Sequence, residues 1–195
     1  MFNSITRTLL LSAALFGGAQ AHADWQVAND QSRVNFVSVK NNQIAENHYF
    51  KQISGVLSDA GEFNLTIDLA SVETQIPIRN ERMQKMLFNT VEFPALTLQA
   101  DVKALLAELK QQGRAQANLD ATVSLHGKTQ TVNIDLLASL DKNNNIQVSS
   151  MAPVLVKPAD FALTSGIDEL QKVAGLKSIT RAVPVSFVLT LNESK

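Results

Sequence analysis

Apolar and polar residues alternate one by one over much of the chain. The runs of this kind cover residues 63–69, 96–102, 115–125, 131–136, 146–149 and 183–191. Successive side chains of a β-strand point to opposite faces of the sheet, so each run predicts a strand with one apolar and one polar face. Weaker versions of the pattern predict strands at 25–27, 34–39 and 50–56, with Gly55 as a bulge or a close backbone approach.

Three stretches break the alternation and predict short helices between the strands. Residues 78–88, 104–109 and 167–176 place their apolar side chains at helical spacing. Polar segments rich in Asn, Asp, Gly and Ser, which favour turns, separate several strands at 58–61, 126–129 and 141–145. The sequence therefore predicts a mainly β protein with about eight antiparallel strands, arranged as a sandwich or an up-and-down barrel, and two or three short helices.

The first 23 residues have the features of a secretory signal peptide. Arg7 precedes the apolar run 8–19, and Ala21 and Ala23 supply the small residues of a cleavage site. Twelve helical residues would span only about 18 Å, which is too short for a hydrocarbon core of roughly 30 Å. We expect cleavage after Ala23, a single domain over 24–195, and a soluble protein that resides in the periplasm of a double-membrane bacterium.

Composition narrows the classes of function. The 17 basic and 18 acidic side chains give a net charge of −1, which argues against an extended nucleic-acid surface. The chain has no cysteine, so disulfides and thiolate metal sites are excluded. Neither a GxSxG nor a phosphate-binding glycine motif is present.

The histidines do not form a recognisable catalytic or metal-binding set. His48 and His126 lie far apart in the mature chain, without HxH or HExxH spacing. We expect His126 to be a solvated turn residue, and His48 to be either a loop residue or a donor at a ligand entrance. The sequence thus predicts no catalytic residues, no metal site and a protein that is not an enzyme.

A cluster of polar residues stands at the start of the 78–88 helix and includes Arg79, Asn80 and Arg82. It has two interpretations. The cluster is a solvated helix end, with Arg82 paired to a nearby acid, or its donors form a polar mouth that holds the oxygen-bearing head of a ligand. In either case the arginines need an acceptor, for which Glu81 is the nearest carboxylate in the sequence.

An ordered set of segments across residues 25–191 resembles the YceI family of exported, lipocalin-like proteins. Its most specific members are FNTVEFP at 88–94 and LHGKT at 125–129, and the others are Trp25, 32–36, 54–55, 67–68, 71–74, 79–83 and 160–161. The resemblance implies an extended antiparallel barrel with an elongated interior that accepts polyisoprenoid chains such as the ubiquinone tail. The chain departs from the family at Asn80 and Arg82, where many members carry Asp and His, and in the 41–49 loop.

The leading hypothesis is a binding protein that carries or stores a long-chain isoprenoid or similar amphiphile. Ten buried CH₂ groups would contribute about 8 kcal/mol before ordering costs. We expect no cofactor beyond a bound isoprenoid or quinone lipid. The residues predicted to face the ligand are Phe36, Phe63, Leu65, Ile67, Leu98, Leu119, Val123, Ile134, Phe187 and Leu189.

Two alternatives remain open at this stage. One is a periplasmic interaction or stress protein whose barrel is filled by side chains and whose exposed helices, 78–88 and 167–176, contact a partner. The other is a hydrolase. A transient contact with a membrane or a membrane protein is compatible with both the lipid-binding and the interaction hypothesis. The same is true of a homodimer.

Overall fold

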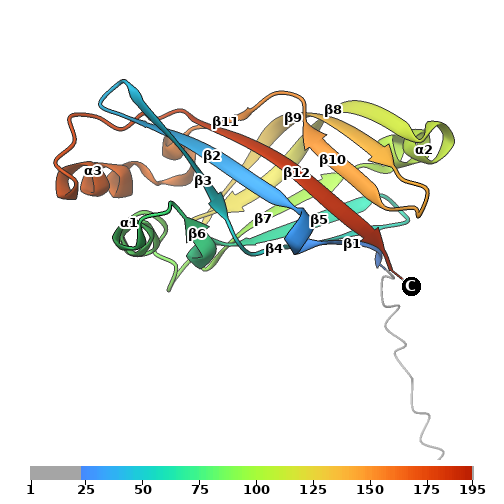
Figure 1. Ribbon diagram of the computed structural model, residues 1–195, viewed down its shortest axis with the longest axis horizontal. Coiled ribbons are helices and arrows are strands. Elements are labelled where there is room, and N and C mark those ends of the chain that lie inside the picture. The colour runs from blue at the N-terminus through green and yellow to red at the C-terminus, as the bar shows by residue number, and fades with distance from the viewer. Residues whose placement is uncertain (1–22, 195) are drawn as a thin grey trace, which may run out of the picture.

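The computed structural model describes residues 23–194, and within them antiparallel strands wrap into a closed barrel (Figure 1). The predicted signal peptide falls almost entirely outside these residues, and the predicted cleavage point lies at the first residue of the first strand. Eight strands form the ring, in the order β1 (Ala23–Val27), β4 (Ile53–Ser58), β5 (Glu62–Asp68), β7 (Ala95–Asp101), β8 (Arg114–Leu125), β9 (Lys128–Leu140), β10 (Ile146–Ser150) and β12 (Val183–Glu193). Pairing of β1 with β12 closes the ring, which confirms the predicted mainly β barrel.

The last strand, β12, changes partners along its length. Its final residues pair with β10 and β1, whereas its first half pairs with β11 (Val154–Val156) and β2 (Arg33–Lys40). Strand β2 continues the wall to β3 (Ile44–Phe50) and then to the short β6 (Val72–Glu73). The β2–β3 hairpin thus extends the barrel at one end, which we call the hairpin end.

Helices lie at the two ends of the barrel (Figure 1). Helix α2 (Lys103–Gln112) lies at the end opposite the hairpin, where Gly113 ends it with a φ of 71°. At the hairpin end lie α3 (Thr164–Val173) and α1 (Pro77–Arg82), which runs directly into a π-helical segment, η3 (Met83–Phe88). The remaining helices are single 3₁₀ turns, η1 (Asn29–Gln31), η2 (Leu69–Ser71) and η4 (Pro158–Phe161).

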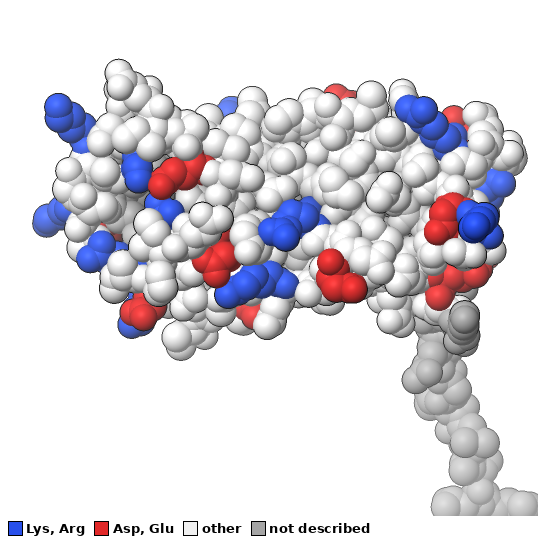
Figure 2. Space-filling view, viewed as in Figure 1, with Lys and Arg blue, Asp and Glu red and all other residues white. Residues whose placement is uncertain are grey.

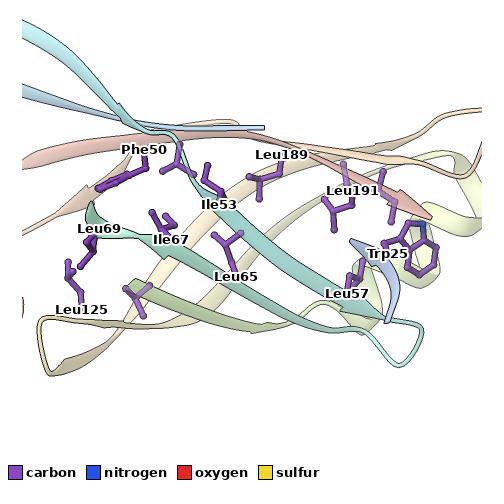
Figure 3. Packing of buried hydrophobic residues seen from close by; sticks show 14 of the residues in the cluster. Trp25, Phe50, Ile53, Leu57, Leu65, Ile67, Leu69, Leu125, Leu189 and Leu191 are labelled. Carbon is purple, nitrogen blue, oxygen red and sulfur yellow. The ribbon is translucent and has the colours of Figure 1, made fainter. Parts of the chain in front are cut away.

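The end that carries α2 is tightly packed, and we call it the packed end. Trp25, Leu57, Leu109, Ile146 and Leu191 come from five different elements there, and each is at most 4% exposed. The indole Nε1 of Trp25 donates to the carbonyl oxygen of Asn144 at 2.7 Å, so its one polar group is also satisfied. In Figure 3 the labelled side chains run from Trp25, Leu57 and Leu191 at this end to Phe50, Leu69 and Leu125 at the other.

The predicted loop at 41–49 was wrong, and the predicted strand at 50–56 begins later than expected, at Ile53. Only 41–43 form a loop, since Ile44–Phe50 is strand β3, and the chain bends at Lys51 and Gln52 before β4 begins. Asn41 and Asn42 adopt positive φ values of 52° and 61°, which allows the tight return between β2 and β3. The bend is held by Ser71, whose carbonyl accepts from the amide of Lys51 and whose hydroxyl accepts from that of Gln52.

Two smaller predictions concern single residues. Gly55 does sit at a close approach, because a Cβ there would lie 2.8 Å from the carbonyl oxygen of Asn64. His126 is in the predicted turn, with a φ of 50°, but it is not fully solvated. Its half-buried ring packs on Phe93, with the ring centroids 4.4 Å apart.

Candidate ligand-binding site

An elongated cavity of about 250 Å³ occupies the barrel interior. Every residue that lines it is Ala, Val, Leu, Ile, Phe or Pro, so no side chain in its wall can form a hydrogen bond. It reaches from Leu106 and Leu109 of α2 to Leu163 and Ile167 at the α3 end. Because a cavity remains, the interior is not the side-chain-filled barrel of the alternative hypothesis.

Strand register explains how the wall is built. Leu65 pairs with Leu98 across β5 and β7, and Leu119 pairs with Ile134 across β8 and β9. Paired residues share a face of the sheet, so the predicted alternation brings these side chains together inside the barrel. Several are only half-buried, among them Leu98, because part of their surface faces the cavity.

The inner face changes from apolar to polar along the β2–β3 hairpin. Phe36 and Phe50 line the cavity, and Phe36 pairs directly with His48. His48 therefore points to the same inner side as Phe36, and the next inner pair toward the hairpin tip is Ser38 with Glu46. The apolar cavity thus borders a polar group of residues at the hairpin end.

Arg79 from α1 completes this polar group. Its Nη1 donates to Oε2 of Glu46 at 2.7 Å, and its Nη2 donates to the carbonyl oxygen of Thr74 at 2.7 Å. Nζ of Lys40 lies 3.0 Å from the same Glu46 oxygen. Burial acts to raise the pKa of Glu46, but the hydrogen bonds and positive charges of Lys40 and Arg79 outweigh it and hold the pKa below its ordinary value.

His48 is the most buried member, with 3% of its surface exposed. Its Nε2 lies 3.1 Å from the hydroxyl oxygen of Ser38, and its ring packs on Phe36 with centroids 5.3 Å apart. Burial lowers the pKa of His48, the positive charges of Arg79 and Lys40 lower it further, and Glu46 opposes them in part. The imidazole is therefore neutral near pH 7. We call Ser38, Lys40, Glu46, His48 and Arg79 the hairpin cluster.

The comparison with protein families agrees with the fold. A family model described as the YceI-like domain matches residues 25–191. The chain belongs to the YceI-like family. No curated protein matches this YceI-like protein in a sequence search.

Solved structures give further relatives. A polyisoprenoid binding domain from Saccharophagus degradans is 34% identical with a TM-score of 0.84, and the match covers 88% of this chain and 99% of that one. Burkholderia cenocepacia BcnA is 18% identical with a TM-score of 0.65, over 84% of this chain and 98% of its own. The Campylobacter jejuni YCEI protein is 17% identical with a TM-score of 0.57, and the match covers 80% of this chain and 91% of that one. The last two matches show a shared fold only.

All ten apolar residues predicted to face the ligand line the cavity of this YceI-like protein. The structure places them in one wall, and their contact with a ligand stays a prediction. They were found because apolar residues recur at every second position, which is the signal of an inward-facing strand face. They are Phe36, Phe63, Leu65, Ile67, Leu98, Leu119, Val123, Ile134, Phe187 and Leu189.

The three polar residues predicted for the mouth have different surroundings. Arg79 joins the hairpin cluster, but its partner is Glu46 and not the predicted Glu81. The side-chain oxygen of Asn80 accepts from the amide of Thr74 at 2.9 Å, and its nitrogen donates to Glu73 at 3.1 Å, so Asn80 holds the turn before α1. Arg82 forms no ion pair within residues 23–194, and none of the three lines the cavity itself.

The carboxylate of Glu73 is strongly stabilised in this turn. Hydrogen bonds from Asn80, from the backbone amide of Gln75 and from Lys51 lower the pKa of Glu73 to about 2. The turn therefore keeps its charge pattern over the ordinary pH range, and it fixes the position from which Arg79 reaches the hairpin. This is a role in positioning Arg79 and not in contacting the cavity.

Sequence reasoning missed Ser38 and Glu46 and placed His48 in a loop. The signal was present, because Glu46, His48 and Phe50 occupy alternate positions, but two of these inward-facing residues are polar.

Within residues 23–194 no group of His, Asp and Glu side chains has the arrangement of a metal site. None of the helices in this part of the chain combines the length and the hydrophobicity that a membrane span requires. On the face shown in Figure 2, acidic and basic side chains are interspersed.

Proposed function

We propose that this protein is a lipid-binding protein that encloses the hydrocarbon chain of an isoprenoid, for carriage or storage, in the periplasm after export. The observation that supports this most strongly is the cavity wall, which contains only apolar side chains along its whole length. Such a wall suits a chain without polar groups and offers nothing to orient a polar substrate. The Saccharophagus degradans relative, named as a polyisoprenoid binding domain, supports the isoprenoid class.

The energetics favour a long, flexible chain. Each buried CH₂ contributes about 0.8 kcal/mol, so ten contribute about 8 kcal/mol before the cost of ordering the chain. The cavity presents no acid, base or nucleophile at which a reaction could be centred. We therefore assign the protein to the binding proteins and not to the enzymes.

Export and ligand can be tested together. The full chain, with residues 1–23, is expressed in a double-membrane bacterium and purified from the periplasmic fraction. We expect the intact mass of a chain that begins at Asp24. We also expect mass spectrometry to detect a prenyl lipid in an organic extract of the fresh protein. Retention of Met1 would contradict the export proposal. An extract free of prenyl lipid, together with no uptake of an added C20 prenol, would contradict the binding proposal.

A further inference from the structure

Two buried nitrogen atoms of the hairpin cluster have no hydrogen-bond partner among the described residues. They are Nδ1 of His48 and Nε of Arg79. Buried polar groups are nearly always paired, so two unpaired atoms in one cluster need an explanation. Both belong to residues around the inner face of the β2–β3 hairpin, directly beyond Phe36 in the cavity wall.

Both side chains are held so that these atoms keep their positions. Ser38 fixes the His48 ring through Nε2, and the pairing of His48 with Phe36 turns the ring inward. Nη1 and Nη2 of Arg79 donate to Glu46 and to the Thr74 carbonyl, so Nε is the one guanidinium nitrogen without a partner among the described residues. A ligand atom at this place would meet groups that are already oriented. Nε of Arg79 donates, and Nδ1 of His48 donates when the Ser38 hydroxyl donates to Nε2 and otherwise accepts.

We propose that His48 and Arg79 bind the head of the lipid chain, and that this head is an uncharged oxygen function, a carbonyl or a hydroxyl. This inference rests on the proposed function. The cavity wall has no polar side chain. At the hairpin cluster, however, the polar head of a lipid can gain hydrogen bonds while its hydrocarbon chain stays in the cavity. The site would also fix which end of the chain points toward the hairpin.

The number of available groups selects the class of head. Two nitrogen atoms can serve one or two hydrogen bonds, which matches one oxygen of a quinone, a ketone or an alcohol. A diphosphate needs several donors at once, and here Glu46 already occupies both nearby cations, Lys40 and Arg79. A quaternary ammonium head would leave both nitrogens unpaired beside positive charge.

The test compares three ligands that share one C20 isoprenoid chain: the prenol, the hydrocarbon without the hydroxyl, and the prenyl diphosphate. Each competes with a fluorescent fatty probe on the delipidated mature protein. Arg79→Lys keeps a cation for Glu46 but lacks the Nε–H, and His48→Phe keeps an aromatic ring against Phe36 but lacks both nitrogens. Arg114→Lys, exposed at the start of β8, is the matched control.

We expect the native protein to bind the prenol about tenfold more tightly than the hydrocarbon, and Arg114→Lys to do the same. Arg79→Lys and His48→Phe should reduce this ratio to near one, while hydrocarbon affinity stays within about twofold of native. Circular dichroism checks the fold of each variant, and either variant alone suffices for the test. An unchanged ratio in a folded variant, or tighter binding of the diphosphate than of the prenol, would overturn the head site. Failure of all three ligands to bind would instead overturn the proposed function, and the head site with it.

Discussion

The packed end and the hairpin end of this barrel use the same strands in opposite ways. At the packed end, Leu191 of β12 lies among Trp25, Ile146 and Leu109 and is 1% exposed. Toward the hairpin end, Phe187 of the same strand is only half-buried, although both residues line the cavity. One strand therefore carries a closely packed side chain at one end of the cavity and a partly uncovered one toward the other end. Variants that separate stability from ligand binding test whether this difference in packing matters.

The largest effect on stability is expected at the packed end. Leu191→Ala should lower the free energy of unfolding by about 3 kcal/mol, because it leaves a hole that closely packed neighbours cannot fill. Leu98→Ala, on a strand beside the cavity, should cost about 1 kcal/mol, because less of its surface is covered in the native state. Urea denaturation of delipidated protein measures both. Equal costs would show that the two regions do not differ in packing.

The largest effect on binding is expected in the cavity wall. Leu98→Asp places a carboxylate where no partner is available, so binding of a C20 prenol should weaken by at least about a hundredfold. Thr66→Asp is the matched control, because Thr66 is exposed on the outer face of the neighbouring strand β5. It should leave affinity unchanged in the same fluorescence competition. If both substitutions weakened binding equally, the inner and outer faces would be assigned wrongly.

A smaller effect should follow from the contact that places α3 at the hairpin end. A Cβ on Gly166 would lie 2.5 Å from the carbonyl oxygen of Met86, so Gly166→Ala must push α3 away from η3. We expect a loss of about 1–3 kcal/mol in stability and faster release of bound prenol, measured by urea denaturation and stopped-flow fluorescence. Ser165→Ala, exposed on the same helix, is the control. Native release kinetics in Gly166→Ala would show that α3 does not cover the cavity.

The smallest effect concerns pH. The folded state holds the pKa of His48 below its ordinary value of 6.5, so the unfolded chain binds that proton more readily. Stability from this group is present above pH 6.5 and is lost as the pH falls toward the folded pKa. The groups that face His48 are Ser38, Glu46 and Lys40 of the hairpin and Arg79 of α1.

Glu46 and Glu73 also have lowered pKa values, but their contributions are lost only below the ordinary value of 4.5. Unfolding free energies measured between pH 7 and pH 5 therefore isolate the histidine. Between pH 7 and pH 5 the native protein should lose less free energy of unfolding than Leu191→Ala or Gly166→Ala loses at constant pH. His48→Phe should give a flatter curve of unfolding free energy against pH. A profile that is identical in the two proteins would contradict the buried neutral imidazole.

The sequence was informative wherever one face of a strand is uniformly apolar. Period-two patterns located β5, β7, β8, β9, β10 and β12, and they identified all ten predicted side chains of the cavity wall. The same reasoning failed for β3, because its inner face carries Glu46 and His48 and so has no apolar repeat. Polar residues on an inward face look like a loop when only hydropathy is considered.

The polar site depends on contacts that no local pattern encodes. Arg79 and Glu46 are 33 positions apart and meet only because the hairpin folds over α1. Arg79 was selected from sequence as a donor near a helix start, but its acceptor could be known only from the tertiary structure. The π-helical segment η3 and the exchange of partners along β12 likewise had no signal in the hydropathy pattern.

The exchange of partners along β12 separates the length of the barrel from the strand register that closes it. Around Val188 the strand changes neighbours on both edges, from β11 to β10 and from β2 to β1. Hydrogen-bond registers on the two sides of this point are set by different strands. Residues gained or lost in pairs in the β2–β3 hairpin would alter the length of the tube without shifting the register that closes the ring. A hairpin of different length would therefore change the length of the chain that the proposed lipid site accepts, while the strand register that closes the barrel stays the same.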